Sequence, residues 1–250
     1  MQPLSFLDLE LRASPARSRG RPTKSRWYAL GCGLLALLWI GFARSHGVEE
    51  GDANFIQSQQ GFHFWPYFYL GAKHMVTGYD HLLFLAAVIF FLYRLRQIAT
   101  YVTLFAIGHS ITLVAGVWWD IPANAYLIDA VIGFSIVYKA FENMGGFDKL
   151  AWKPDTRLAV WIFGLFHGFG LATKLQALDI SPDGLLANLL AFNLGVEAGQ
   201  LLSLLAIVTL VNFWRIAAGF KNQALIANSL IMSAGFVFIL YQLSGWFAYA

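Results

Sequence analysis

The 250-residue sequence contains little cysteine and little charge. Its lone cysteine, Cys32, excludes an internal disulfide and any cysteine-rich metal site, so a metal ion would have to be held by histidine, carboxylate or amide groups. Charged residues make up only 12% of the chain and hydrophobic residues 58%, and the mean hydropathy is +0.58. This balance lies outside that of soluble domains and predicts an integral membrane protein whose main partner is the lipid bilayer.

The small basic surplus does not form a nucleic-acid-binding face. The formal net charge is +3, but six of the 17 Lys and Arg residues lie in the first 26 positions and the others are spread over short loops. Nucleic-acid binding requires basic side chains gathered on one face or along one helix. We therefore expect no nucleic-acid partner, and the basic residues are better explained by membrane topology.

Apolar runs recur along the whole chain. All but the first of them are long enough to cross a hydrocarbon core about 30 Å thick. The pattern predicts an all-α membrane protein, a bundle of six to seven transmembrane helices. The runs are Trp27–Phe42, Pro66–Tyr93, Ile98–Trp118, Ile121–Phe141, Leu158–Leu175, Leu185–Val211 and Ala224–Tyr249.

Basic residues divide unequally between the two ends of these runs. Fourteen belong to the N-terminal stretch and to alternate connections, whereas the opposite connections hold only Arg44, Lys73 and Lys174. Loops rich in Lys and Arg stay in the cytoplasm. The chain is therefore predicted to be multi-pass, with its N-terminus cytoplasmic and its C-terminus outside.

The N-terminal quarter divides into segments of different character. The run Trp27–Phe42 ends at Ala43-Arg44-Ser45, a small-x-small pattern that suits signal peptidase, so it is either a signal anchor or a cleaved signal peptide. Cleavage would leave His46 as the mature N-terminus, where its imidazole and the α-amine form a chelating pair. His46 and His63 are candidate ligands at the entrance of an ion pathway. The predicted segments are a disordered basic cytoplasmic tail (1–26), the signal segment (27–45), an extracytoplasmic segment (46–65) and a six-helix transmembrane domain (66–250).

The most informative stretch lies within the second apolar run. His74 and His81 are separated by seven residues, which places them on one face of a continuous helix, and Asp80 points about 100° away from His81. The Asp80 side chain either points toward a neighbouring helix or fixes the tautomer of an imidazole. Ionisable groups at bilayer depth cost at least roughly 2.5–3.5 kcal/mol each and mark ion paths, proton relays or metal sites. The stretch therefore predicts a functional site.

Later helices carry matching polar groups at similar depth. The predicted metal ligands are His74, Asp80, His81, His109, His167 and Glu197. Each of these alone is more typical of a hydrogen-bonded core residue, but together they favour one shared site. The predicted supporting residues are Ser110, Asp129, Asn193 and Gln200. Glu142 and Asn143, beside Lys139, fit either a cytoplasmic exit or an interfacial salt bridge.

Several motifs in this order resemble the HupE/UreJ family of bacterial membrane proteins, in its second, less characterised subgroup. The resemblance implies a secondary permease of the bacterial inner membrane for nickel or cobalt, and a metal-binding role for His74, Asp80 and His81. The motifs are His74-x5-Asp80-His81-Leu-Leu-Phe, Gly108-His109-Ser110-Ile-Thr112-Leu, Phe134-Ser135-Ile-Val-Tyr138 with Glu142-Asn143, Phe166-His167-Gly168-Phe169-Gly170, and Phe192-Asn193-Leu-Gly195-Val-Glu197-x-Gly199-Gln200.

The residue types leave the metal and the function class open. The best-studied nickel branch has a histidine-richer fifth-helix segment than Phe166-His167-Gly168, so nickel follows from kinship. Imidazole with carboxylate suits nickel, cobalt, zinc or copper. A metal-binding accessory subunit of a larger membrane complex and an intramembrane zinc-dependent hydrolase are the alternatives, although no catalytic residue stands out. If transport is right, uptake should fall below about pH 6.5, because imidazoles bind metal only when neutral.

Overall fold

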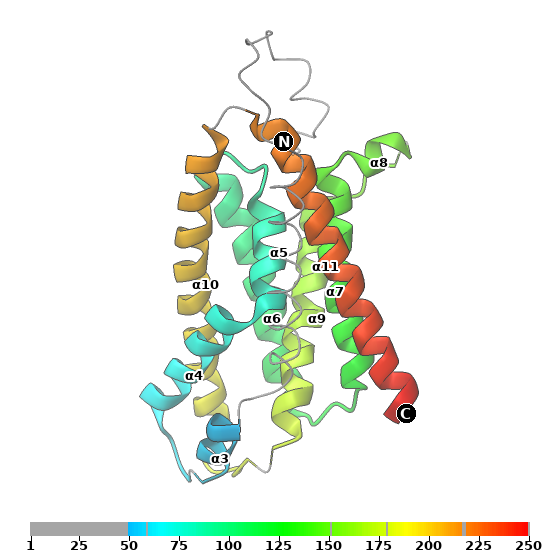
Figure 1. Ribbon diagram of the computed structural model, residues 1–250. Helices are drawn as coiled ribbons and strands as arrows, with labels where there is room; N and C mark the ends of the chain where they lie inside the picture. The colour runs from blue at the N-terminus through cyan, green and yellow to red at the C-terminus, as the bar shows by residue number, and fades with distance from the viewer. Residues whose placement is uncertain (1–49, 59, 151, 179, 217–218, 250) are drawn as a thin grey trace.

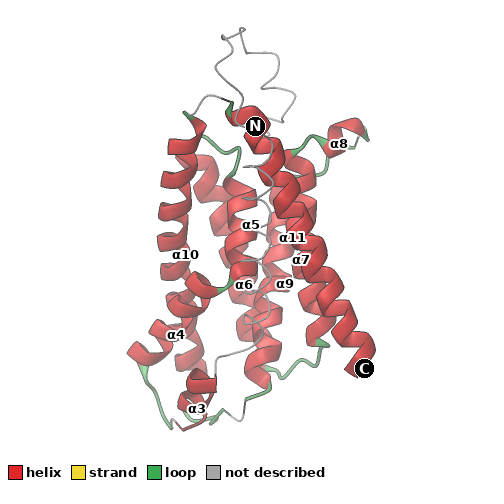
Figure 2. Ribbon diagram, viewed as in Figure 1, coloured by secondary structure: helices red, strands yellow, loops and turns green. Residues whose placement is uncertain are grey.

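The computed structural model describes residues 50–58, 60–150, 152–178, 180–216 and 219–249. These residues contain helices and no strand (Figure 2). The helices are α3 (Glu50–Ser58), α4 (Phe64–Thr77), α5 (Tyr79–Ile89), α6 (Leu95–Trp118), α7 (Ala125–Asn143), α8 (Gly146–Lys149), α9 (Thr156–Gln176), α10 (Leu185–Arg215) and α11 (Phe220–Tyr249). The long helices run side by side in one bundle, with α3 at one end and α8 at the other (Figure 1). The prediction of an all-α membrane protein is confirmed.

Four of the helices are long and apolar enough to cross a membrane: α6, α9, α10 and α11. The 19-residue helix α7 lies alongside them, but Asp129, Lys139 and Glu142 lower its apolar character. The α4–α5 segment also lies within the bundle (Figure 1). These helices correspond to six of the predicted runs, whereas Trp27–Phe42, the tail before it and His46 lie outside the described residues.

The second predicted run is not a single helix. Helix α4 ends at Thr77 and α5 begins at Tyr79, because Gly78 adopts an extended backbone with φ −73° and ψ 101°. Glycine is the weakest helix former after proline, by about 1 kcal/mol relative to alanine. The Gly78 N–H still donates to the His74 carbonyl at 2.8 Å, and the Gly78 carbonyl accepts from Leu82 N–H at 3.0 Å. The break therefore leaves Gly78 fully hydrogen-bonded, as a bundle interior requires.

The segment before α4 is more ordered than a solvated connector. It forms α3, whose Ile56 is 1% exposed and joins the main hydrophobic core. Lys73 on α4 pairs with Asp52 on α3 at 2.9 Å. Lys73 is therefore a helix residue that pairs with a carboxylate. The prediction of membrane topology had assumed that it lies in a loop.

Glycines hold the long helices together in three close pairs. In the α4–α10 pair, a Cβ on Gly71 would collide with the carbonyl oxygen of Phe192, and one on Gly195 with that of Phe68. In the α6–α9 pair, a Cβ on Gly168 would collide with the carbonyl oxygen of His109. Gly133 and Gly235 make the corresponding approach between α7 and α11. Such small-residue contacts are typical of membrane helices, and here they fix the backbones that carry the polar groups.

Candidate metal centre

The break at Gly78 brings His74 and His81 into direct contact. His74 lies in the last turn of α4 and His81 in the first turn of α5, and their Nε2 atoms are 3.1 Å apart. In a continuous helix, seven residues would separate the two positions by roughly 10.5 Å along the axis. The prediction of one continuous helix here is wrong, so a shared helix face is not what brings the two rings together. The two rings meet because the helix is interrupted between them.

His109 on α6 and His167 on α9 complete a cluster of four imidazoles, which we call the histidine cluster. The ring centroid of His81 is 5.9 Å from that of His109 and 5.2 Å from that of His167. His81, His109 and His167 are each at most 3% exposed. Gly168 allows the backbones of α6 and α9 to meet beside His109, and the Thr112 hydroxyl donates to the Leu165 carbonyl at 2.6 Å. The sequence prediction that these histidines converge is consistent with this geometry.

Three buried ring nitrogens of the cluster have no hydrogen-bond partner among the described residues: Nδ1 of His81, Nε2 of His109 and Nε2 of His167. The Nδ1–H of His167 donates to the Phe163 carbonyl at 2.8 Å, and in a neutral imidazole this fixes a lone pair on Nε2. Buried polar atoms are normally paired, and an exception calls for an explanation. A ring nitrogen that carries an unshared lone pair is a ligand that a transition-metal ion can use.

Charged groups flank the histidine cluster. Asp80 lies in the first turn of α5, where a carboxylate is favoured by the helix dipole, and it interacts electrostatically with His81, Lys174 and His167. Lys174, in the last turn of α9, pairs with Asp129 of α7 at 3.2 Å. Lys174 is therefore a helix residue, and its predicted place in a loop is wrong. Its spacing of seven residues from His167 was the available sign that both lie on one helix face.

The polar stripe of α10 contacts the bundle through Asn193. Its amide donates to Ser110 Oγ at 2.8 Å and to Glu197 Oε1 at 3.4 Å, and Ser110 in turn donates to the Ala106 carbonyl. Within the described part of the chain, no imidazole lies within ion-pair distance of Glu197. The structure thus places Asn193 and Ser110 between α10 and α6, whereas Glu197 stays a predicted ligand that no contact joins to the histidine cluster.

The predicted entry residue His63 lies apart from the histidine cluster. Its ring Nε2 is 2.9 Å from the Gln60 carbonyl, and its backbone N–H donates to Asn188 Oδ1 at 2.8 Å. Asn188 also donates to the Gly61 carbonyl at 2.9 Å, so it fastens this loop to α10. An entry role for His63 stays a prediction.

A second polar group lies at the α8 end. Glu142 pairs with Lys139 at 2.6 Å and accepts a hydrogen bond from Thr156, which agrees with the interfacial salt bridge considered from the sequence. Asn143 donates to the Ala87 carbonyl at 2.8 Å and to Asn228 at 2.9 Å. These contacts hold the second half of α5 against α7 and α11.

Arg215 caps the C-terminal end of α5. Its guanidinium donates to the Ile89 carbonyl at 2.9 Å and to the Phe90 carbonyl at 2.6 Å, and it lies over the Tyr93 ring. In the sequence, Arg215 is simply one of the fourteen basic residues assigned to the cytoplasmic side. Its position after a long apolar helix gave no sign that it would cap a different one.

The histidine cluster is not a closed metal site. In the part of the chain that the structure describes, no three His, Cys, Asp or Glu side chains already surround a common metal position. The ring centroid of His81 is 5.1 to 5.9 Å from those of the other three imidazoles, which is close to the spacing of two imidazoles on one ion at metal–nitrogen distances of about 2.0–2.1 Å, so binding requires the rings to turn rather than to approach. The metal-ligand role of the predicted residues stays a prediction.

Comparison with known sequences places the chain in a family. The sequence model described as HupE / UreJ protein matches residues 50–250, which is most of the chain. No curated protein and no solved structure matches it. The match covers α3 through α11 and includes every member of the histidine cluster. This chain therefore belongs to the HupE/UreJ family.

Proposed function

We propose that this protein is a permease that carries a divalent transition-metal ion, nickel or cobalt, across the bacterial inner membrane. One observation carries the proposal: buried imidazole nitrogens that have no partner among the described residues belong to neighbouring rings on α5, α6 and α9, and the α5 ring lies beside a break in a membrane helix. Imidazole is a favoured ligand of these metals, with zinc and copper as further cargoes that the ligand type allows. Family membership supports the same conclusion.

The broken helix supports a transport site in particular. Interrupted helices in membrane bundles occur where backbone lines a substrate site, and the positive end of one half-helix faces that site. Here the first turn of α5 carries both Asp80 and His81. The Asp80 carboxylate offsets the positive end of α5 and lowers the cost of bringing a bare dication beside it.

The position of Lys174 supports transport of a metal ion rather than tight metal storage. Its ammonium interacts electrostatically with Asp80, His74 and His167. A fixed positive charge at this position weakens the hold on a dication, and release at the far side requires weak occupancy. The absence of a preformed ligand group among the described residues agrees with this, because a site whose side chains must reorient around its ion binds the ion less tightly than one that is already formed.

The distribution of basic residues supports an inward direction of cation transport. We assign the α8 end, which carries Lys149, Lys153 and Arg157, to the cytoplasm, and the α3 end to the outside. Inward movement of a cation would then follow the membrane potential, which is worth about 2.3 kcal/mol per charge per 100 mV.

Flux in liposomes tests the proposal. The purified full chain would be reconstituted in one orientation, and entry of nickel, cobalt, zinc and copper would be compared with that of His81→Ala. Thr209→Ala is the control, because Thr209 is exposed on α10 and its hydroxyl donates within the same helix to the Leu205 carbonyl. We expect nickel or cobalt entry that is lost in His81→Ala and kept in Thr209→Ala. No flux of any of the four metals through folded protein would overturn the permease, and tight retention without flux would favour an accessory subunit or an enzyme.

A further inference from the structure

The long helices divide into two groups that pack internally more than with each other. Helix α4 packs along α10, α6 along α9 and α7 along α11, and α7 also contacts α5 and α9. Within the described residues, α10 contacts α5 and α6 only sparsely. We call α4 and α10 the α4–α10 pair, and α5, α6, α7, α9 and α11 the core group. The α4–α10 pair forms one side of the bundle (Figure 1).

Close contacts make each group rigid. In the α4–α10 pair, a Cβ on Gly199 would lie 2.7 Å from the Ala72 carbonyl oxygen. In the core group, a Cβ on Gly108 of α6 would lie 2.6 Å from the Trp161 carbonyl oxygen of α9. Asn143 of α7 donates to a carbonyl of α5 and to a side chain of α11. Backbones held this closely move together, so each group behaves as one body.

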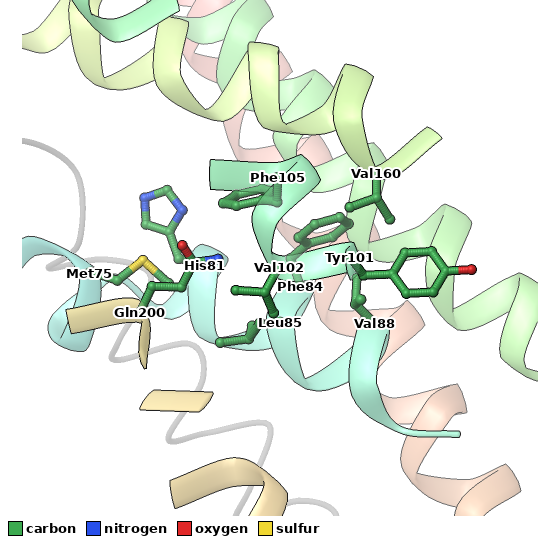
Figure 3. Close-up of a pocket in the computed structure, with 10 residues that line it drawn as sticks. All are labelled: Met75, His81, Phe84, Leu85, Val88, Tyr101, Val102, Phe105, Val160 and Gln200. Carbon is green, nitrogen blue, oxygen red and sulfur yellow. The ribbon is translucent and has the colours of Figure 1, made fainter. Parts of the chain in front are cut away.

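The boundary between the two groups contains an apolar cavity with room for about one water molecule. Met75 of α4 and Gln200 of α10 line it from one group, and Phe84 of α5 and Val102 of α6 line it from the other (Figure 3). Most protein interiors are close-packed, so the space marks a place where the two groups fit less tightly. Apolar surfaces can part or slide here without the loss of a hydrogen bond.

Gly78 forms a joint between the two groups. Its N–H donates to the His74 carbonyl on the α4 side, and its own carbonyl accepts from Leu82 on the α5 side. The φ and ψ bonds of Gly78 lie between these two hydrogen bonds, so rotation about them turns α4 against α5 without breaking either. Hinges are a few residues at element ends that absorb such changes, and glycine has the widest choice of backbone angles.

Arg215 joins the α4–α10 pair to the core group at the α8 end. Its guanidinium donates to the carbonyls of Ile89 and Phe90 at the end of α5. At the depth of the histidine cluster, the Asn193 amide donates across the boundary to the Ser110 hydroxyl at 2.8 Å. Charge-assisted hydrogen bonds are roughly twice as strong as neutral ones. The pair is therefore held more firmly at the α8 end than beside the cluster.

We infer that the α4–α10 pair is an outer gate of the histidine cluster, which opens when the pair tilts against the core group about Gly78 and Arg215. This inference rests on the proposed function, because it describes how the same ion reaches the same site. His74 moves with the pair, whereas the other three histidines of the cluster stay with the core group. Opening parts His74 from His81 and admits the ion from the α3 end. An ion that bonds both rings stabilises the closed arrangement.

The length of α10 sets the size of the movement. The helix runs from Leu185 at the α3 end to Arg215, a span of roughly 45 Å at 1.5 Å per residue. A tilt of about 5° about Arg215 would move the Leu185 end by about 4 Å, which is measurable between spin labels.

Distances between spin labels, measured by double electron–electron resonance, test the outer gate. The purified full chain carries Cys32→Ser, which removes the only native thiol. Tyr69→Cys on α4 with Trp119→Cys at the end of α6 reports the distance across the boundary, and both side chains are exposed. Tyr69→Cys with Leu186→Cys on α10 is the matched control within the α4–α10 pair. The probe is nickel alone at saturation, and titration calorimetry on the same labelled chains reports whether it binds.

We expect nickel to shorten and narrow the Tyr69–Trp119 distance distribution, by a shift of up to about 4 Å for the tilt given above, and to leave the Tyr69–Leu186 distance unchanged. His74→Ala should still bind nickel through the core group but should lose the shift. A chain that binds nickel without the shift, or that shifts both distances alike, would overturn the outer gate and leave the proposed function standing. A chain that binds no nickel would overturn the proposed function and the gate with it, so the two failures are distinguishable.

Discussion

Substitution of Gly78 by alanine tests whether the break in the α4–α5 segment builds the metal centre. The backbone itself tolerates alanine, since φ is −73°. A Cβ at this position would lie 2.8 Å from Cδ2 of His81 and 2.9 Å from the His74 carbonyl oxygen, whereas ordinary van der Waals contact begins at 3.4 Å. The His81 ring must therefore move by about 0.6 Å. Alanine also favours a continuous helix by about 1 kcal/mol, which would draw the two imidazoles apart.

The expected result of Gly78→Ala is a loss of nickel affinity with the helical fold retained. Overpacking of this kind costs about 1–3 kcal/mol, which corresponds to roughly a 5- to 150-fold weaker nickel complex if the cost falls on the metal site. Isothermal titration with nickel gives the affinity, and far-UV circular dichroism reports the fold. Gly51→Ala is the matched control, because a Cβ on Gly51 meets nothing within 4 Å. Equal nickel affinity in both variants would refute the role assigned to the break.

Three further outcomes follow from the contacts described above. His167→Gln should lower nickel affinity measured by titration, whereas His63→Gln should leave the affinity of the histidine cluster unchanged; similar losses in both would count against the cluster. Asp129→Asn should lower the free energy of unfolding by about 1–3 kcal/mol because it removes the carboxylate partner of the half-buried Lys174 ammonium, and adding Lys174→Met should recover part of this in thermal unfolding. Gly199→Ala should destabilise the protein, because its Cβ would lie 2.7 Å from the Ala72 carbonyl oxygen, and an unchanged unfolding temperature would refute the close α4–α10 contact.

The helices were largely predictable from hydropathy, because a bilayer requires long apolar runs. The predicted run Leu158–Leu175 lies within α9, and Leu185–Val211 shares its first residue with α10. The break at Gly78 was not predicted, because an isolated glycine is common inside membrane helices and periodicity continues across it. Its consequence, the contact between His74 and His81, depends on the changed direction of the chain.

Some residues of the candidate site were predictable from the free-energy cost of burying ionisable side chains in a membrane. Buried imidazoles in a membrane are expensive, so His81, His109 and His167 could be grouped by depth alone. The depth of a residue in the membrane does not show which way its side chain points, however. Glu197 was expected at the depth of the histidines, but no imidazole of the described residues lies within ion-pair distance of it. Met75 and His81 line the same small cavity (Figure 3), but a methionine in an apolar helix is typical of ordinary packing and was no sign of this position.

The location of a bound nickel ion tests the central claim most directly. Crystals of the full chain grown with nickel would be measured at the nickel absorption edge, where anomalous scattering places the metal without reference to the protein. The account predicts an anomalous peak beside the Gly78 break, within coordination distance of His81 and at least one of His74, His109 and His167. A peak found only at Glu197 or at the Lys139–Glu142 pair, with none at His81, would contradict it.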